Sequence, residues 1–226
     1  MISTFRTATA TLAVAALAAP AAANHVDFFE EGQFTLLLSP GQTMVSDTQT
    51  DPDGDTILGN TRNVQLMFAP GGNQGIVVSA QLDTNGGSLE FSNNSNTNAT
   101  LTLGYGATST LDVLSNASGP DYGQFGFEVL SVDGSGTVTA TATDTDGDTG
   151  SATLSFDTAG TFFLGYDSFH DDVDFDMLDT LTFDVVGDSA GFDTTLGSIT
   201  REVVPEPTSL ALLGLGAVGL LARRRR

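Results

Sequence analysis

Hydrophobic and polar residues alternate through most of the chain between residues 24 and 203. A repeat of two is typical of strands that bury one face and expose the other. The clearest segments are residues 34–39, 64–68, 75–82, 101–105, 125–132, 138–143, 151–156, 161–166 and 181–186. Clusters of Gly, Asn, Asp and Pro separate them and supply the backbone geometries that turns require. Residues 191–199 are expected to add a last strand or a bulged hairpin, and no stretch outside the two ends has a helical period.

This pattern predicts an all-β fold of about nine to twelve strands in one domain, residues 24–203. Strands of this kind pack as two antiparallel sheets, so we expect an antiparallel two-sheet sandwich, jelly-roll-like rather than a closed barrel. About 180 residues are enough to bury roughly 70% of the surface of the unfolded chain. The phenylalanines are expected to fill the core, because the chain has no tryptophan.

The first 23 residues have the order of a secretory signal peptide. Arg6 supplies a positive start, residues 8–19 form a small apolar run, and residues 21–23 are three alanines suited to cleavage. We expect a signal helix that is removed, so that the mature chain begins at Asn24.

The last 23 residues have three parts with different chemistry. They are Val204, Pro205, Glu206 and Pro207, then an apolar run over residues 208–222, then Arg223, Arg224, Arg225 and Arg226. The two prolines favour extended geometry, so a peptidase could bind this segment as an unfolded strand. As a helix the apolar run would span about 22 Å, against about 30 Å for the hydrocarbon core, which makes a marginal transmembrane anchor. The arginines would stay on the cytoplasmic side, because clustered Lys and Arg resist translocation.

The order of Pro-Glu-Pro, short hydrophobic helix and terminal arginine cluster resembles the PEP-CTERM sorting signal, the exosortase substrate tail of Gram-negative bacteria. The resemblance covers the tail, residues 204–226, and leaves the body uncharacterised. It implies export, an inner-membrane intermediate, cleavage near residues 204–207 by an exosortase-type membrane peptidase, and delivery to the cell surface or extracellular matrix. An ordinary C-terminal anchor that stays in place is the alternative, and it has the same topology.

The charge of the body is strongly negative. Glu206 is the only one of the 28 acidic residues outside residues 24–204, and only Arg62 and Arg201 oppose the others there. The chain has no lysine, so nucleic acid is excluded as a partner, since almost no cation is present to neutralise phosphates. Two explanations stay open, namely solubility in salty surroundings and the binding of divalent cations. With no cysteine, the exported fold makes no disulfide.

Two short aspartate ladders are candidates for calcium. They are Asp51, Asp53 and Asp55, and Asp144, Asp146 and Asp148. Carboxylates at every second position around a glycine turn can wrap oxygen atoms around Ca²⁺. Neither ladder follows the full EF-hand pattern, because threonine stands where the loop glycine belongs and the final bidentate glutamate is missing. The second ladder also predicts a structural feature, a hairpin turn at Asp146-Gly147.

A third acidic run covers residues 167–176. If residues 172–176 form a strand, Val173 and Phe175 point to the core. The three aspartates at 172, 174 and 176 then share the other face, which suits an edge strand or a loop. His170 lies in this run, and a single histidine among carboxylates is more often solvated than catalytic.

Catalysis has little support in the residue types. The chain has no cysteine or lysine nucleophile, and no Gly-x-Ser-x-Gly, zinc-protease or phosphate-loop motif. We therefore expect a non-enzymatic surface or matrix protein, with a structural or adhesive role in the exopolysaccharide layer of a biofilm. The first alternative is a calcium-dependent carbohydrate-binding module. The second is a secreted hydrolase with paired carboxylates, which the lack of tryptophan platforms for sugar rings disfavours.

Overall fold

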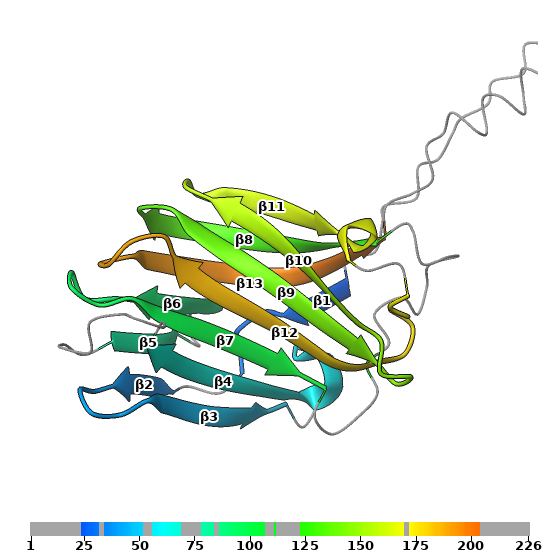
Figure 1. Ribbon diagram of the computed structural model, residues 1–226, viewed down its shortest axis with the longest axis horizontal. Helices are drawn as coiled ribbons and strands as arrows, with labels where there is room; N and C mark the ends of the chain where they lie inside the picture. Colours follow the sequence, from blue (N-terminus) through cyan, green and yellow to red (C-terminus); the bar gives the residue numbers. More distant parts are fainter. Residues whose placement is uncertain are drawn as a thin grey trace, which may run out of the picture.

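The computed structural model describes residues 24–31, 34–51, 56–68, 78–83, 86–106, 111, 123–169 and 172–203. Within these ranges the chain forms two antiparallel sheets and two single-turn 3-10 helices, η1 (Leu58–Asn60) and η2 (Tyr166–Ser168). The predicted all-β fold of two antiparallel sheets is confirmed (Figure 1). The expected signal helix and C-terminal hydrophobic helix lie outside the described residues.

The sheets have a regular order of strands. The first, called here the β8 sheet, runs β11 (Gly160–Gly165), β8 (Gly123–Asp133), β13 (Asp193–Val203), β6 (Ser88–Ser92), β5 (Val78–Asp83) and β2 (Thr35–Leu38), and β1 (Asn24–Asp27) pairs with β13. The second, the β9 sheet, runs β10 (Thr149–Phe156), β9 (Gly136–Asp144), β12 (Leu178–Gly187), β7 (Ala99–Tyr105), β4 (Thr61–Phe68) and β3 (Met44–Thr50). Each of the nine clearest predicted segments overlaps a strand, and residues 191–199 overlap β13, whose register shifts twice as expected for bulges.

Three strands, β1, β3 and β6, are not among the predicted segments, although β6 alternates between buried and less buried residues. β1 and β6 are short, with four and five residues. β3 has seven residues, and none of them is buried. An edge strand without a buried face carries no hydrophobic repeat, so β3 gives no signal in the sequence.

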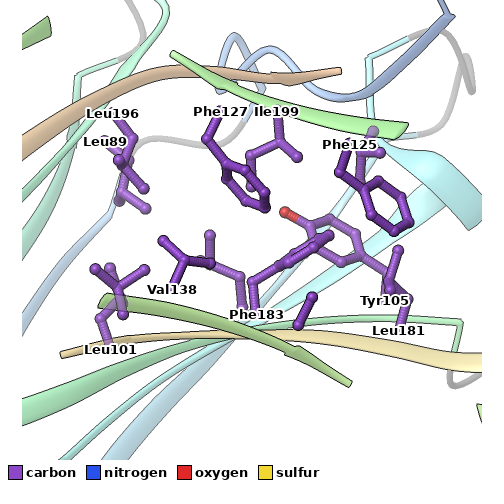
Figure 2. Close-up of a cluster of buried hydrophobic side chains, with 14 of the residues drawn as sticks. Leu89, Leu101, Tyr105, Phe125, Phe127, Val138, Leu181, Phe183, Leu196 and Ile199 are labelled. Atoms are coloured by element: carbon purple, nitrogen blue, oxygen red, sulfur yellow. The ribbon is translucent and has the colours of Figure 1, made fainter. Parts of the chain in front are cut away.

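The core lies between the two sheets. Figure 2 shows Phe125, Phe127 and Ile199 on one side, facing Phe183 and Val138 on the other. The rings of Phe127 and Phe183 meet edge to face, with centroids 5.1 Å apart at an interplanar angle of 81°. This geometry is favoured between aromatic rings, and it confirms the prediction that phenylalanines fill the core.

The acidic run near η2 forms the loop, not the edge strand, of the two alternatives that the sequence left open. Residues 172–176 form turns, in which the Asp176 N–H donates to Asp174 Oδ1 at 2.9 Å. Val173 and Phe175 are buried as predicted, and the Phe175 ring stacks on Tyr166 with centroids 4.4 Å apart. An aspartate that accepts from the backbone two residues ahead stabilises a turn, so the loop is right and the edge strand is wrong, and the inward direction of Val173 and Phe175 is as expected. His170 lies outside the described residues.

Both described ends of the chain lie at the same end of the sandwich. Asn24 of β1 is the register partner of Arg201, two residues before β13 ends at Val203 (Figure 1). Strand direction also places the β9–β10 turn and the segment after η2 at this end. The acidic turns therefore lie where the sorting segment begins.

Candidate functional site

Asp51 of the first aspartate ladder holds the connection from β3 to β4. Its side chain is buried, and Asp51 Oδ2 accepts hydrogen bonds from the backbone N–H of Thr56 at 2.7 Å and of Ile57 at 3.1 Å. The Thr56 hydroxyl donates to the same oxygen at 3.0 Å. Asp53 and Asp55 lie outside the described residues.

Asp144 of the second ladder organises the β9–β10 turn. Asp144 Oδ1 accepts from the N–H groups of Asp146 and Asp148, and Asp144 Oδ2 accepts from the N–H of Asp174, each at 3.0 Å. The hydrogen bond from Asp174, helped by those from the turn, lowers the pKa of Asp144 because these donors favour the charged form. Gly147 has φ of +94°, and the predicted Asp146-Gly147 hairpin turn is confirmed. The side chains of Asp146 and Asp148 are exposed.

No group of three His, Cys, Asp or Glu side chains converges as metal ligands in the described part of the chain. Calcium at either ladder therefore stays a prediction. Among the helices of the same part, none has the length and apolar character needed to cross a membrane. The predicted apolar span at residues 208–222 and its arginine cluster lie outside it.

A buried ion pair joins β1 to the β9 sheet. Arg62 Nη1 lies 2.6 Å from both carboxylate oxygens of Asp27, and both side chains are fully buried. Tyr105 donates its hydroxyl to Asp27 Oδ2 at 2.8 Å, and the Phe29 N–H donates to Oδ1 at 2.8 Å. Arg62 Nη2 also donates to the Glu31 carbonyl oxygen at 2.9 Å. Because β1 belongs to the β8 sheet, this network connects the two sheets.

The burial of this network sets its electrostatics. Burial raises the pKa of Asp27, while the Arg62 guanidinium acts in the opposite direction. Burial and then the charge of Asp27 raise the pKa of Tyr105 well above its usual value, so the phenol stays a neutral donor. Sequence reasoning missed the pair. One feature of the sequence could have indicated it. Arg62 lies two residues before Val64, so in a strand its side chain points to the same inward face of β4.

An exposed aromatic ring defines a second feature, on the outer face of the β8 sheet. Phe163 of β11 is 47% exposed, and its register partner across to β8 is Gly126. A Cβ at Gly126 would lie 3.3 Å from Phe163 Cε1 and 2.6 Å from Thr200 Oγ1. Glycine is therefore needed at 126 for the ring to lie against the sheet between β11 and β13.

Polar pairs flank this ring on both sides. Gln124 Nε2 donates to Glu202 Oε2 at 3.1 Å, and the Ser198 hydroxyl donates to Glu128 Oε2 at 2.9 Å. We call these four residues, together with Phe163, Gly126 and Thr200, the Phe163 face. An apolar ring beside oriented carboxylates, an amide and hydroxyls is the combination that binds a sugar, because the C–H groups of a pyranose pack on the ring while its hydroxyls form hydrogen bonds.

The two glutamates of the Phe163 face lie at well-separated backbone positions along the strands. Glu128 is the register partner of Ser198 and Glu202 that of Gln124, so the two positions differ by about 13 Å along the strands. Paired carboxylates of glycosidases lie roughly 5–10 Å apart. A separate hollow of about 260 Å³, lined by Ser135, Ser155, Phe156 and Asp157, contains a single carboxylate.

The fold thus defines an antiparallel two-sheet β-sandwich, and the comparison with protein families adds the C-terminal signal. Residues 203–226 match the family model of the PEP-CTERM protein-sorting motif, which confirms the predicted tail. A PEP-CTERM signal marks an exported protein that an exosortase processes. No curated protein sequence matches the chain.

Solved structures with a similar arrangement share little sequence with this chain. A solution structure of CtCBM11 has 12% identity over 84% of this chain and 100% of its own, with a TM-score of 0.40. The family 11 carbohydrate-binding module from Clostridium thermocellum, in complex with a β-1,3-1,4-mixed-linked tetrasaccharide, has 10% identity over 75% and 95%, with a TM-score of 0.33. The agarase AgWH50C has 10% identity and a TM-score of 0.43 over 62% of this chain, which spans only 24% of that enzyme.

Proposed function

We propose that this exported protein works without catalysis as a structural or adhesive component of the extracellular polysaccharide layer. Its tail directs it to the inner membrane, an exosortase cuts near residues 204–207, and the released body is delivered to the surface of a Gram-negative cell. There it holds polysaccharide on the Phe163 face. The observation that carries the proposal is the half-exposed ring of Phe163 lying over Gly126 between two polar pairs.

The ligand that suits this face is a neutral polysaccharide. Both charged side chains on the Phe163 face are carboxylates, Glu128 and Glu202, in a chain of formal charge −21. An anionic polymer would be repelled, whereas neutral hydroxyls can donate to these carboxylates. The separation of about 13 Å between the two carboxylate positions supports binding rather than hydrolysis.

Binding of the purified body to a glycan array tests the proposal. Residues 24–203 are a suitable fragment, because all described strands pair with one another. We expect Phe163→Ala to weaken binding by about tenfold or more, as truncation of an aromatic anchor does. Met67→Ala is the matched control, since Met67 is 41% exposed on β4 of the other sheet. Circular dichroism of both variants shows that the fold is kept.

Two other results would favour a different function, and a third would overturn the proposed one. Binding that survives Phe163→Ala but is lost in EDTA would indicate the calcium-dependent carbohydrate-binding module. Release of new reducing ends from a bound polysaccharide would indicate the hydrolase. Absence of binding to every neutral glycan would overturn the proposed role of the Phe163 face.

A further inference from the structure

The β10 strand forms one edge of the β9 sheet. It pairs with β9 without interruption over its eight residues, from Thr149 opposite Thr143 to Phe156 opposite Gly136. Among the described strands none pairs with its other side. The next strand, β11, belongs to the β8 sheet. An unpaired strand side presents N–H and C=O groups that another strand can use.

Two other described edges, β2 and β3, carry features that discourage such pairing, and β10 does not. The edge strand β11 also lacks charge and proline, but it has only six residues. β2 has only four residues. β3 carries Asp47, whose register partner Val64 is fully buried, so the carboxylate lies on the inward side of an edge strand. Short edges and inward charges both oppose edge-to-edge association. β10 is eight residues long and contains neither a charge nor a proline.

The β9–β10 turn determines which backbone groups point to the open side. The Asp144 N–H donates to the Asp148 carbonyl oxygen at 3.0 Å, and hydrogen-bonded pairs alternate with non-hydrogen-bonded pairs from there. The odd-numbered residues of β10 therefore direct N–H and C=O outward. The hydroxyls of Thr141 and Ser151 lie 2.9 Å apart, as the closer side chains of a non-hydrogen-bonded pair allow.

We propose that β10 is the docking edge for a second copy of this chain, and that two β10 strands pair antiparallel to join two β9 sheets into one. A two-fold axis near Ala152 brings Ser151 of one copy opposite Thr153 of the other and Thr149 opposite Ser155. All four are outward-directed residues, so their backbone groups exchange hydrogen bonds. The hydroxyls of Ser151 and Thr153 would then share one face across the new junction, at the wider spacing of a hydrogen-bonded pair.

Charge and burial at this edge also fit a second copy. β10 is uncharged although the whole chain carries a formal charge of −21, so the carboxylates nearest the paired strands are Asp148 and Asp157, one beyond each end of β10. Leu154 and the neighbouring Phe162 are only partly buried at this edge, and a second copy would cover them. The net charge of the two bodies opposes association, so added salt should strengthen the dimer.

Sedimentation velocity of residues 24–203 tests this proposal over a concentration series up to about 1 mM, because a small interface gives a weak dimer. We expect a monomer–dimer equilibrium that shifts toward dimer at higher salt. Thr153→Glu and Thr153→Pro should raise the dissociation constant by about tenfold or more, the first by like charge and the second by loss of an outward donor. Circular dichroism shows whether each variant is folded.

Two matched variants make the assignment to β10 specific. Thr139→Glu adds the same charge to the same face, since the Thr139 and Thr153 hydroxyls lie 3.3 Å apart, but it lies on the inner strand β9 and should leave the dimer intact. Thr161→Glu places the charge on β11, the neighbouring edge of the other sheet. A protein that stays monomeric at every concentration and salt overturns the proposal. So does an equal effect of Thr139→Glu, or a loss of dimer with Thr161→Glu alone. Sugar binding at Phe163 is measured separately, so either proposal can fail without the other.

Discussion

Removing Arg62 should destabilise the protein in a way that depends on pH. In the variant Arg62→Leu, the fully buried carboxylate of Asp27 loses the guanidinium that lies 2.6 Å away. Tyr105 and the Phe29 N–H still donate to it, but they carry no compensating charge. A buried carboxylate in this position binds a proton instead of staying charged.

The free energy of protonating Asp27 at pH 7 gives the expected loss of stability. Protonating a carboxyl group of ordinary pKa near 3.9 at pH 7 costs about 4 kcal/mol, because each pH unit is worth about 1.4 kcal/mol. This agrees with about 3–5 kcal/mol for breaking a buried ion pair. The carboxyl pKa in the folded variant is raised, so the stability deficit grows as pH rises above the unfolded pKa. It should shrink between pH 7 and pH 4.5 by at most about 3 kcal/mol, because the raised pKa of Asp27 gives wild type part of the same pH dependence.

Asp27→Asn is the contrasting variant. It leaves the Arg62 guanidinium buried without its counter-charge, and it has no carboxyl group at position 27 to take up a proton. The growth of the deficit with rising pH expected for Arg62→Leu should therefore be absent. The double variant Arg62→Leu with Asp27→Asn should be more stable than either single variant, because no uncompensated charge remains. Urea unfolding of residues 24–203, followed by far-ultraviolet circular dichroism, measures all four proteins. A deficit for Arg62→Leu below about 1 kcal/mol at pH 7, or an equal deficit at pH 4.5, would refute this reasoning.

Three further predictions concern the β9–β10 turn and the tail. Asp144→Asn should lower the free energy of unfolding at pH 7. Because hydrogen bonds from Asp174 and the turn lower the pKa of Asp144, the stability advantage of wild type over this variant should be lost as pH falls below about 4. A difference between the two proteins that does not change with pH would contradict this. Changing Pro205 and Pro207 together to Ala should leave export intact but hold the protein in the membrane fraction, because the extended recognition segment is lost; normal processing in cell fractionation would contradict this. Neutral residues in place of Arg223–Arg226 should let the short span slip through the membrane, so the unprocessed chain would appear outside the inner-membrane fraction.

The sequence alone determined the features that depend on local pattern. Alternation of period two predicted the sandwich, because one buried face of a strand repeats every second residue whatever its partners are. The tail was equally clear, since its signal is the linear order of Pro-Glu-Pro, apolar run and arginines. The Asp146-Gly147 turn was predictable because a turn is stabilised by its own residues, including the positive φ of Gly147.

Tertiary structure decided the features that join segments distant in the chain. Nothing near Arg62 indicates that Asp27, 35 residues away, neutralises it, because the pair forms only when β1 returns to lie against β13. The Phe163 face likewise forms only when β8 and β13 pair. Gly126 and Thr200 are register partners in that pairing although they are 74 residues apart in the sequence. Sheet edges follow the same rule. In the sequence β10 has the same alternation as the other half-buried strands. Its side without a strand partner results only from the order in which the described strands pair.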